Sequence, residues 1–175
     1  VYAEVAEEVL AAAHDFGADA IGFQLWNGDG FEGTVRIAET IRDRRPEMPL
    51  FAGGPQVDWF RAEILRYTRA FTALVLGEGE PTIVPLAEYV DGRRSLASVP
   101  NCLYLAGRRL RRTKRQKVRQ LDDLALPCYR PEVYPSLHGG GQIKLITLDE
   151  SRGCPGRCAF CLHGRKSGNR WRFKS

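Results

Sequence analysis

The chain has 175 residues, which suffices for one domain with an additional segment or for two small domains. Its 43% hydrophobic and 27% charged residues are typical of a folded globular protein and exclude a disordered chain. The formal net charge is +5, and no apolar run approaches the roughly 18–20 residues that cross a bilayer, so we expect no membrane span.

The first half of the chain alternates predicted helices with short apolar strands. Amphipathic patterns predict helices over residues 1–16, 34–45, 57–69 and 81–90, with Gly17 as a helix C-cap. Apolar runs predict strands over residues 20–26, 50–52 and 73–76. Strands that alternate with helices of this length pair in parallel through right-handed crossovers. The sequence therefore predicts a Rossmann-like α/β domain over residues 1–92.

Each predicted strand ends in a loop that contains glycine, over residues 27–30, 53–55 and 77–79. Open α/β sheets bind ligands beyond the carboxyl ends of their strands. Glycine permits close approach of a ligand to the backbone, and helix N-termini offer free N–H groups. Glycine in any one loop can serve the turn alone, but three such loops at one sheet edge favour a ligand site.

A doubly wound sheet usually has about five parallel strands, whereas only three are predicted here. The chain opens on a helix and has no initiating methionine. We therefore expect it to be a fragment, with two strands preceding residue 1.

A predicted hairpin follows the α/β domain. Residues 101–105 and 110–118 flank a turn over residues 106–109, which is typical of a hairpin. Residues 108–119 contain eight lysines and arginines and no acidic residue: Arg108, Arg109, Arg111, Arg112, Lys114, Arg115, Lys117 and Arg119. A basic run can bind nucleic acid through phosphate contacts. We favour a solvated hairpin, and we do not expect nucleic acid as a partner.

An extended connector precedes the last segment. Leu121-Asp122-Asp123-Leu124 leads to three prolines, at Pro127, Pro131 and Pro135. We assign residues 93–138 to a hairpin and linker. Three consecutive glycines at 139–141 mark the next boundary, and residues 142–148 are predicted to form the first strand of the segment 139–175.

Three of the five cysteines, Cys154, Cys158 and Cys161, lie within eight residues. Three thiolates on so short a loop can converge on one inorganic cluster, and on a four-iron cluster they leave one iron open to a ligand. A tight cysteine group in a chain without a signal peptide is typical of metal chemistry in a reducing compartment, so we expect a cytoplasmic protein. A zinc site completed by His163 is the alternative.

The cysteine segment, Ser-Arg-Gly-Cys-Pro-Gly-Arg-Cys-Ala-Phe-Cys over residues 151–161, resembles the signature loop of the radical S-adenosylmethionine enzymes. The resemblance implies a 4Fe–4S cluster on Cys154, Cys158 and Cys161. It further implies that S-adenosylmethionine binds the fourth iron, with Phe160 near its adenine. Residues 142–148 would then be the first strand of a partial (β/α) barrel, of which only the opening is present.

The upstream part resembles the N-terminal domain of the cobalamin-dependent branch of that family. The similar segments are residues 18–23, 51–55, 76–80 and the linker 121–127. The resemblance implies an N-terminally truncated, flavodoxin-like cobalamin domain whose loops face the corrin and its nucleotide tail. The residues expected to contact cobalamin are Trp26, Asn27, Gly53, Gly54, Gly77, Glu78 and Gly79.

His14 is not expected to be a cobalt ligand. Cobalamin proteins that supply an axial histidine use Asp-x-His-x-x-Gly, and Ala12 stands here in place of the aspartate. The segment also closes a predicted helix instead of following a strand. We therefore interpret His14 as a residue at a helix C-terminus.

The function that the resemblance implies is radical-based modification, often methylation, of an unactivated carbon in a small-molecule substrate. A one-electron reductant protein such as a flavodoxin or ferredoxin would be the partner. Two alternatives stay open: a binding module that holds cobalamin without catalysis, and a protein that binds zinc and nucleic acid through the cysteine loop and the basic run.

Overall fold

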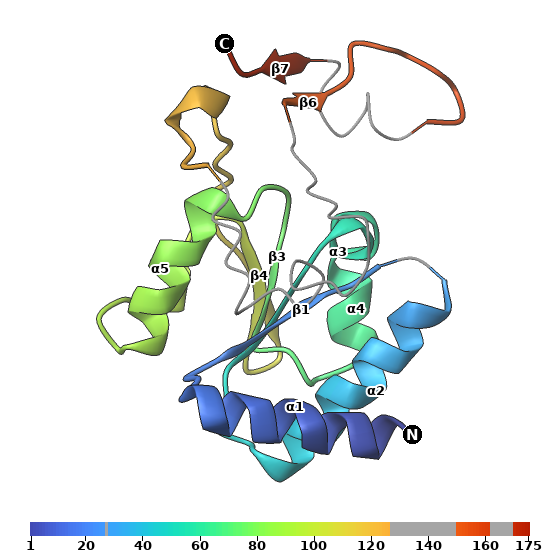
Figure 1. Ribbon diagram of the computed structural model, residues 1–175, viewed down its shortest axis with the longest axis vertical. Coiled ribbons are helices and arrows are strands. Elements are labelled where there is room, and N and C mark those ends of the chain that lie inside the picture. Colours follow the sequence, from blue (N-terminus) through green and yellow to red (C-terminus); the bar gives the residue numbers. More distant parts are fainter. Residues whose placement is uncertain (27, 127–149, 162–169) are drawn as a thin grey trace, which may run out of the picture. The chain divides into compact units, whose positions relative to one another are not determined.

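The structure is a computed structural model that describes residues 1–26, 28–126, 150–161 and 170–175. The chain divides into two compact units, Val1–Lys117 and Val118–Ser175. The first unit has a five-stranded sheet with helices on both faces: α5 covers one face, and α2, α3 and α4 lie on the other (Figure 1). None of the described helices combines the length and the apolar character that crossing a membrane requires.

The sheet has the strand order β1-β2-β3-β4-β5. The strands β1 (Ile21–Gln24), β2 (Leu50–Gly53) and β3 (Ala73–Val75) pair in parallel. The strand β4 (Cys102–Ala106) is antiparallel to β3, and β5 (Arg109–Arg112) is antiparallel to β4. The parallel-rich sheet confirms the predicted Rossmann-like, flavodoxin-type α/β class. The hairpin, expected in the connecting segment, extends this sheet.

Five helices accompany the strands: α1 (Tyr2–Phe16), α2 (Asp29–Arg44), α3 (Pro55–Phe60), α4 (Ala62–Tyr67) and α5 (Glu80–Val90). The C-cap of α1 is Gly17, as predicted, with a φ of 64°. The single helix predicted over residues 57–69 is wrong. Arg61 has a φ of 49°, which no α-helix accommodates, and it separates α3 from α4. A short 3-10 helix, Leu96–Ser98, precedes β4.

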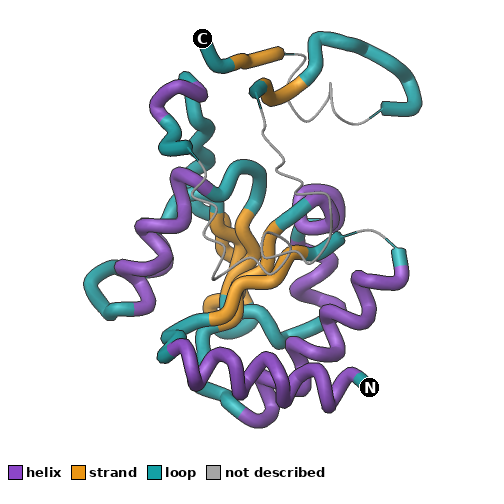
Figure 2. The backbone as a smooth tube through the Cα atoms, viewed as in Figure 1, coloured by secondary structure: helices purple, strands orange, loops and turns teal. Residues whose placement is uncertain are grey.

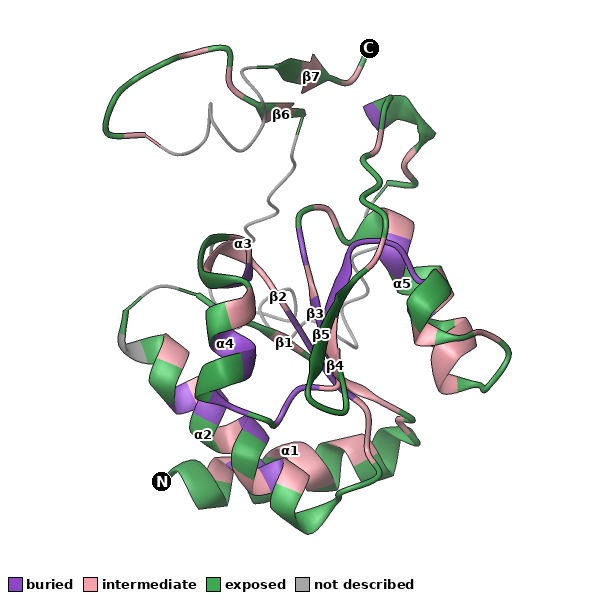
Figure 3. Ribbon diagram, turned by 180° about the vertical axis from the view of Figure 1, so that it is seen from behind, coloured by how far each residue is buried: buried purple, intermediate pink, exposed green. Residues whose placement is uncertain are grey.

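The two faces of the sheet are covered by different clusters of buried side chains. On β2, Leu50 and Ala52 belong to the main cluster, which also contains Val35 and Ile41 of α2. Phe51, which alternates with them, packs on the opposite face with Leu86 of α5 and with Val99. This is the two-residue periodicity of a strand that is covered on both sides. Figure 3 shows the buried residues along β2 and β3.

The second unit contains a small antiparallel pair, β6 (Ser151–Gly153) and β7 (Trp171–Phe173), in which Gly153 is opposite Trp171 (Figure 2). A 3-10 helix, Leu121–Asp123, belongs to the same unit. The backbone N–H of Ser175 donates to Asp122 Oδ1 at 3.0 Å, so the chain end is held to this turn. The strand predicted over residues 142–148 and most of the expected connector lie outside the described residues.

Candidate functional site

The carboxyl ends of the three parallel strands meet at one edge of the sheet, as the sequence predicts. The chain just after β1 lies against the end of β2, because the N–H of Leu25 donates to the carbonyl of Gly53, the last residue of β2, at 2.8 Å. Trp26, just beyond β1, is 56% exposed. Asn27, a further predicted cobalamin contact, lies outside the described residues.

Gly54 occupies a position that only glycine can fill. Its φ of 103° and ψ of −178° are in a region that residues with a Cβ rarely enter. A Cβ on Gly54 would lie 2.9 Å from the carbonyl oxygen of Leu25. That oxygen also accepts from the N–H of Gln56 at 3.3 Å. The glycine therefore lets the loops after β1 and β2 come into contact.

The loop after β3 is held from both sides. The N–H of Gly77 donates to Asp58 Oδ1 at 2.6 Å. The carbonyl of Glu78 accepts from Asn101 Nδ2 at 3.2 Å. Gly79 is the N-cap of α5, and its carbonyl accepts from the N–H of Thr82 at 2.8 Å. This glycine loop is thus fixed in position before any ligand arrives.

Asn101 is a supporting residue that the sequence reasoning missed. It is 1% exposed and has a φ of 62°, and it lies directly before β4. Besides its bond to Glu78, its Nδ2 donates to Thr82 Oγ1 at 3.2 Å, and its Oδ1 accepts from the N–H of Gln116 at 2.7 Å. One side chain therefore joins the glycine loop and the start of α5 to the chain after β5. The sequence signal that could have drawn attention to Asn101 is that asparagine adopts a positive φ more readily than most residues with a side chain.

A cleft of about 680 Å³ lies between the sheet and α5, and it reaches from the glycine loops at this edge to Asp19, before β1, and Asp91, after α5. Its floor includes small residues, among them Ala20 and Gly22, and its wall on α5 includes Ile83 and Leu86. Three of the predicted contacts, Gly53, Gly54 and Gly79, line the cleft. Trp26, Gly77 and Glu78 are not among its lining residues. Mostly apolar clefts with a few polar groups are typical ligand sites.

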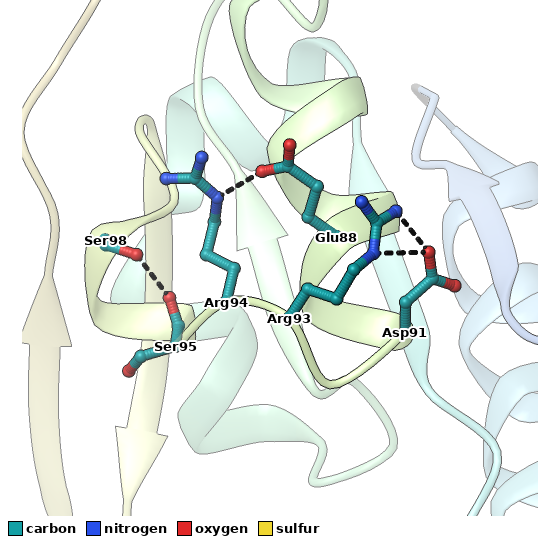
Figure 4. A network of polar contacts seen from close by, with 6 residues as sticks. All are labelled: Glu88, Asp91, Arg93, Arg94, Ser95 and Ser98. Carbon is teal, nitrogen blue, oxygen red and sulfur yellow. Dashed lines mark hydrogen bonds and ion pairs between the residues drawn. The ribbon is translucent and has the colours of Figure 1, made fainter.

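The α5 wall was also missed. Its residue Ile83 is apolar and lines the cleft, yet 65% of its surface is exposed. Polar contacts hold the C-terminal end of this wall (Figure 4). Glu88 pairs with Arg94 at 2.5 Å, and Asp91 pairs with Arg93 at 2.5 Å. Asp91 itself lines the cleft, as does Asp19, so two aspartates lie among its otherwise largely apolar lining residues.

The cysteine loop follows β6 directly. The N–H of Gly156 contacts Cys154 Sγ at 3.3 Å, and a Cβ on Gly156 would lie 3.2 Å from that sulfur and 3.8 Å from Cys158 Sγ. Two of the three predicted ligands thus lie beside one glycine. The N–H of Cys161 donates to the carbonyl of Cys158 at 3.2 Å, which turns the chain between the last two cysteines.

The described part of the loop is not assembled as a closed metal site. Among the described residues, no group of three histidine, cysteine, aspartate or glutamate side chains is placed to hold a metal ion. Phe160, the predicted adenine contact, is 92% exposed. His163, the alternative zinc ligand, lies outside the described residues. The three thiols and the glycine between the first two still fit an iron–sulfur cluster in donor type and spacing.

The remaining candidate residues lie apart from the cleft and the loop. Cys102 lies in β4 and is fully buried, and burial raises the pKa of its thiol to about 12. His14 is exposed in the last turn of α1, next to Asp15, which confirms it as a residue at a helix C-terminus. Cys128 lies outside the described residues.

A comparison with protein families identifies the class of domain that this fold and cleft resemble. Residues 1–87 match the family model of the B12 binding domain. The matched segment contains β1, β2, β3 and all three glycine loops. Residues 1–87, which make up most of the first unit, therefore match the B12-binding class, and cobalamin is the ligand for which the class is named.

Two curated proteins are similar to most of this chain. Over 161 residues, 91% of this chain and 35% of the relative, the chain is 26% identical to an uncharacterized methyltransferase of Pyrococcus horikoshii. Over 144 residues, 82% of this chain and 30% of the relative, it is 28% identical to an uncharacterized protein of Methanocaldococcus jannaschii. The chain thus spans about a third of the length of the curated relatives that it matches.

Two solved structures have the same fold. One is the cobalamin-dependent S-adenosylmethionine radical enzyme OxsB with aqua-cobalamin and S-adenosylmethionine bound, with a TM-score of 0.72 and 20% identity. The other is OxsB with aqua-cobalamin, with a TM-score of 0.72 and 21% identity. Each match covers 97% of this chain and 23% of the OxsB chain. At this level of identity the likeness is one of fold.

Proposed function

We propose that this chain is the cobalamin-binding part, and the opening of the radical S-adenosylmethionine part, of an enzyme that modifies an unactivated carbon, with methylation as the reaction. The observation that carries the proposal is the cleft of about 680 Å³ beside the glycine loops, within a segment that matches the B12 binding domain. The Pyrococcus relative is named a methyltransferase, and OxsB is named a cobalamin-dependent S-adenosylmethionine radical enzyme. These two names support the reaction and the cofactors of the proposal.

The cleft suits the nucleotide tail of cobalamin, which carries a planar base on a ribose phosphate. Ile83 and Leu86 provide an apolar wall for the base, and the small residues Ala20 and Gly22 leave room over the sheet. Gly53 and Gly79 have no side chain to block the corrin from the backbone of the loops. Burial of a base against such a wall stabilises binding by roughly 25 cal/mol for each Å² of apolar surface.

The cysteine loop would hold the second cofactor. Cys154, Cys158 and Cys161 would ligate a 4Fe–4S cluster, and S-adenosylmethionine would bind its open iron beside Phe160. When bound, these groups supply one-electron cleavage of the sulfonium, and cobalamin supplies a transferable methyl group. The residues of this chain hold and orient the cofactors. The substrate, a small molecule, and a one-electron reductant protein would be bound by the complete enzyme.

The cobalamin half is tested with two adjacent exposed residues of α5. Ile83 lines the cleft, whereas Val84 is equally exposed, at 63%, and is not among the lining residues. We expect Ile83→Arg to weaken binding of hydroxocobalamin by more than about tenfold, because a charge would replace the apolar wall. Val84→Arg should stay within about twofold. Equal effects of the two substitutions, measured by calorimetry on variants with matching circular dichroism, would exclude the cleft.

The cluster half is tested by anaerobic reconstitution with iron and sulfide. Replacing Cys154, Cys158 or Cys161 with alanine should abolish the visible absorption and the electron paramagnetic resonance signal of a reduced 4Fe–4S cluster. Cys102→Ala is the matched control and should retain both, since Cys102 belongs to the buried core of the first unit. A colourless protein that binds one zinc ion through the same thiols would instead establish the zinc alternative.

A further inference from the structure

A second cavity, of about 660 Å³, lies at the opposite end of the sheet from the glycine loops. Thr72, which directly precedes β3, lines this cavity together with Gly107 and Arg108 of the β4–β5 turn. Because β4 runs antiparallel to β3, that turn is at the amino end of β3. The cobalamin cleft reaches from the glycine loops along the sheet to Asp19 and Asp91, and no residue lines both cavities.

Three arginines line this second cavity: Arg42 of α2, Arg69 from the loop before β3, and Arg108 from the hairpin turn. No aspartate or glutamate is among its described lining residues. Tyr89 and Tyr104, both half-buried, also line the cavity. Guanidinium groups around one space repel each other, and an anion bound among them would offset that repulsion.

Arg42 is held in place by neutral partners. Its Nε donates to the carbonyl of Ala70 at 2.9 Å, and its Nη2 donates to Thr72 Oγ1 at 3.1 Å. Nη1 donates to the carbonyl of Pro46. These bonds fix the guanidinium without neutralising it, and the arginine remains charged. Burial lowers the pKa of Arg42, and the carboxylate of Glu47 acts in the opposite direction.

Arg69 and Arg108 are both exposed and available to a ligand. Across the part of the chain that the structure describes, neither forms an ion pair. Each can therefore offer all of its N–H donors to an incoming anion. A guanidinium matches the geometry of a phosphate group through two parallel hydrogen bonds, which makes arginine the preferred residue for this purpose.

We propose that this cavity binds a small phosphate-bearing anion, held by Arg42, Arg69 and Arg108, at a site separate from that of cobalamin. The fixed guanidinium of Arg42 sets the position of the phosphate, and the two exposed arginines close on it from the loop before β3 and from the hairpin turn. The half-buried tyrosines favour an organic phosphate with a ring over the bare ion, because they offer apolar ring surface in addition to hydroxyl groups.

The site is tested by calorimetric titration of the 175-residue chain with inorganic pyrophosphate and, separately, with adenosine monophosphate. Arg69→Gln and Arg108→Gln should each weaken binding by about tenfold, the effect of losing one charge-assisted hydrogen-bonded pair. Both residues are exposed, so circular dichroism should stay unchanged. Arg111→Gln is the matched control. Arg111 is an exposed cation of the same hairpin that is not among the lining residues, and its substitution should stay within about twofold.

The outcomes separate this site from its alternatives. Saturable binding of either probe in a 1:1 ratio that depends on Arg69 and Arg108 supports the proposal, and tighter binding of the adenosine phosphate identifies the ring as part of the ligand. Saturating hydroxocobalamin should leave the affinity unchanged. No binding overturns the proposal. A loss with Arg111→Gln as large as with Arg108→Gln would also overturn it, because the whole basic run would then be acting as a surface for polyanions such as nucleic acid.

Discussion

Replacing Asn101 with alanine removes the side chain that joins the glycine loop after β3 to the chain beyond β5. Three hydrogen bonds are lost, to the carbonyl of Glu78, to Thr82 Oγ1 and from the N–H of Gln116. At about 1 kcal/mol each they amount to about 3 kcal/mol. Alanine at a φ of 62° costs about 1 kcal/mol more. We expect the free energy of unfolding to fall by about 4 kcal/mol.

The assay is urea unfolding followed by circular dichroism, with the melting temperature expected to fall by about 15 °C. Asn101→Gly separates the two contributions, since glycine accepts the positive φ and should lose only about 3 kcal/mol. Asn101→Asp keeps the acceptor for Gln116 and removes both donated bonds. In native-state hydrogen exchange, the amide of Gln116 should therefore lose protection in the alanine and glycine variants and keep it in the aspartate variant.

A loss below about 1 kcal/mol in the alanine variant would refute this reasoning. It would mean that water or a shifted backbone satisfies Glu78 and Thr82 without the asparagine. Cobalamin affinity is the second measurement, because Gly79, the helix N-cap that follows this loop, lines the cleft. A variant that remains folded should bind hydroxocobalamin more weakly, since part of the binding energy would go to ordering the loop.

Other substitutions test separate features. Gly54→Ala should lose about 3 kcal/mol of stability and most of the cobalamin affinity, because Gly54 has a positive φ and the added Cβ would collide with the carbonyl oxygen of Leu25. Gly30→Ala is the control: no atom lies within 4 Å of its added Cβ, so the free energy of unfolding should change by less than about 1 kcal/mol. Cys102 should resist iodoacetamide at pH 8 in the native protein and react only after unfolding. Burial raises the pKa of Cys102 in the native protein to about 12, whereas the ordinary thiol value is 9.0, so the unfolded chain loses this proton first as the pH rises. The free energy of unfolding should therefore fall between pH 9 and pH 12, and Cys102→Ala should remove this contribution to the pH dependence. His14→Ala should leave the visible spectrum of bound cobalamin unchanged; a shifted spectrum would identify His14 as a cobalt ligand.

The parallel strands and most of the helices could be predicted because their signals are local. The apolar run of each strand and the stripe of α1 follow from the period of the backbone, and Gly17 caps α1 where the sequence predicts it. The start of α2 was placed five residues late, since Gly30 and Gly33 within its first turns have poor helix propensity. The break at Arg61 has no sequence signal, because arginine rarely adopts a positive φ.

The pairing of the hairpin and the walls of the cleft could not be predicted because they depend on tertiary contacts. A hairpin pattern identifies β4 and β5, but not that β4 would pair with β3. Similarly, the apolar residues of α5 predict a helix but do not distinguish their environments. Ile83 lines the cleft alone, and Leu86 lines the cleft and also packs in the core. The glycine loops were predictable as a group because strand ends of a parallel sheet share one edge. The sequence could not predict which residues of these loops line the cleft and which support it from behind.

The last strand of the sheet also bears on how copies of this protein behave towards one another. Among the described strands, β5 pairs on one side only, and its four residues, three of them arginines, are all exposed. An open strand edge is a template for adding a strand from another molecule, which leads to aggregation. The arginines oppose this, because two such edges carry like charges at close range. High salt, which reduces the Debye length to about 3 Å at 1 M, weakens that repulsion. The protein should therefore stay monodisperse best at low ionic strength.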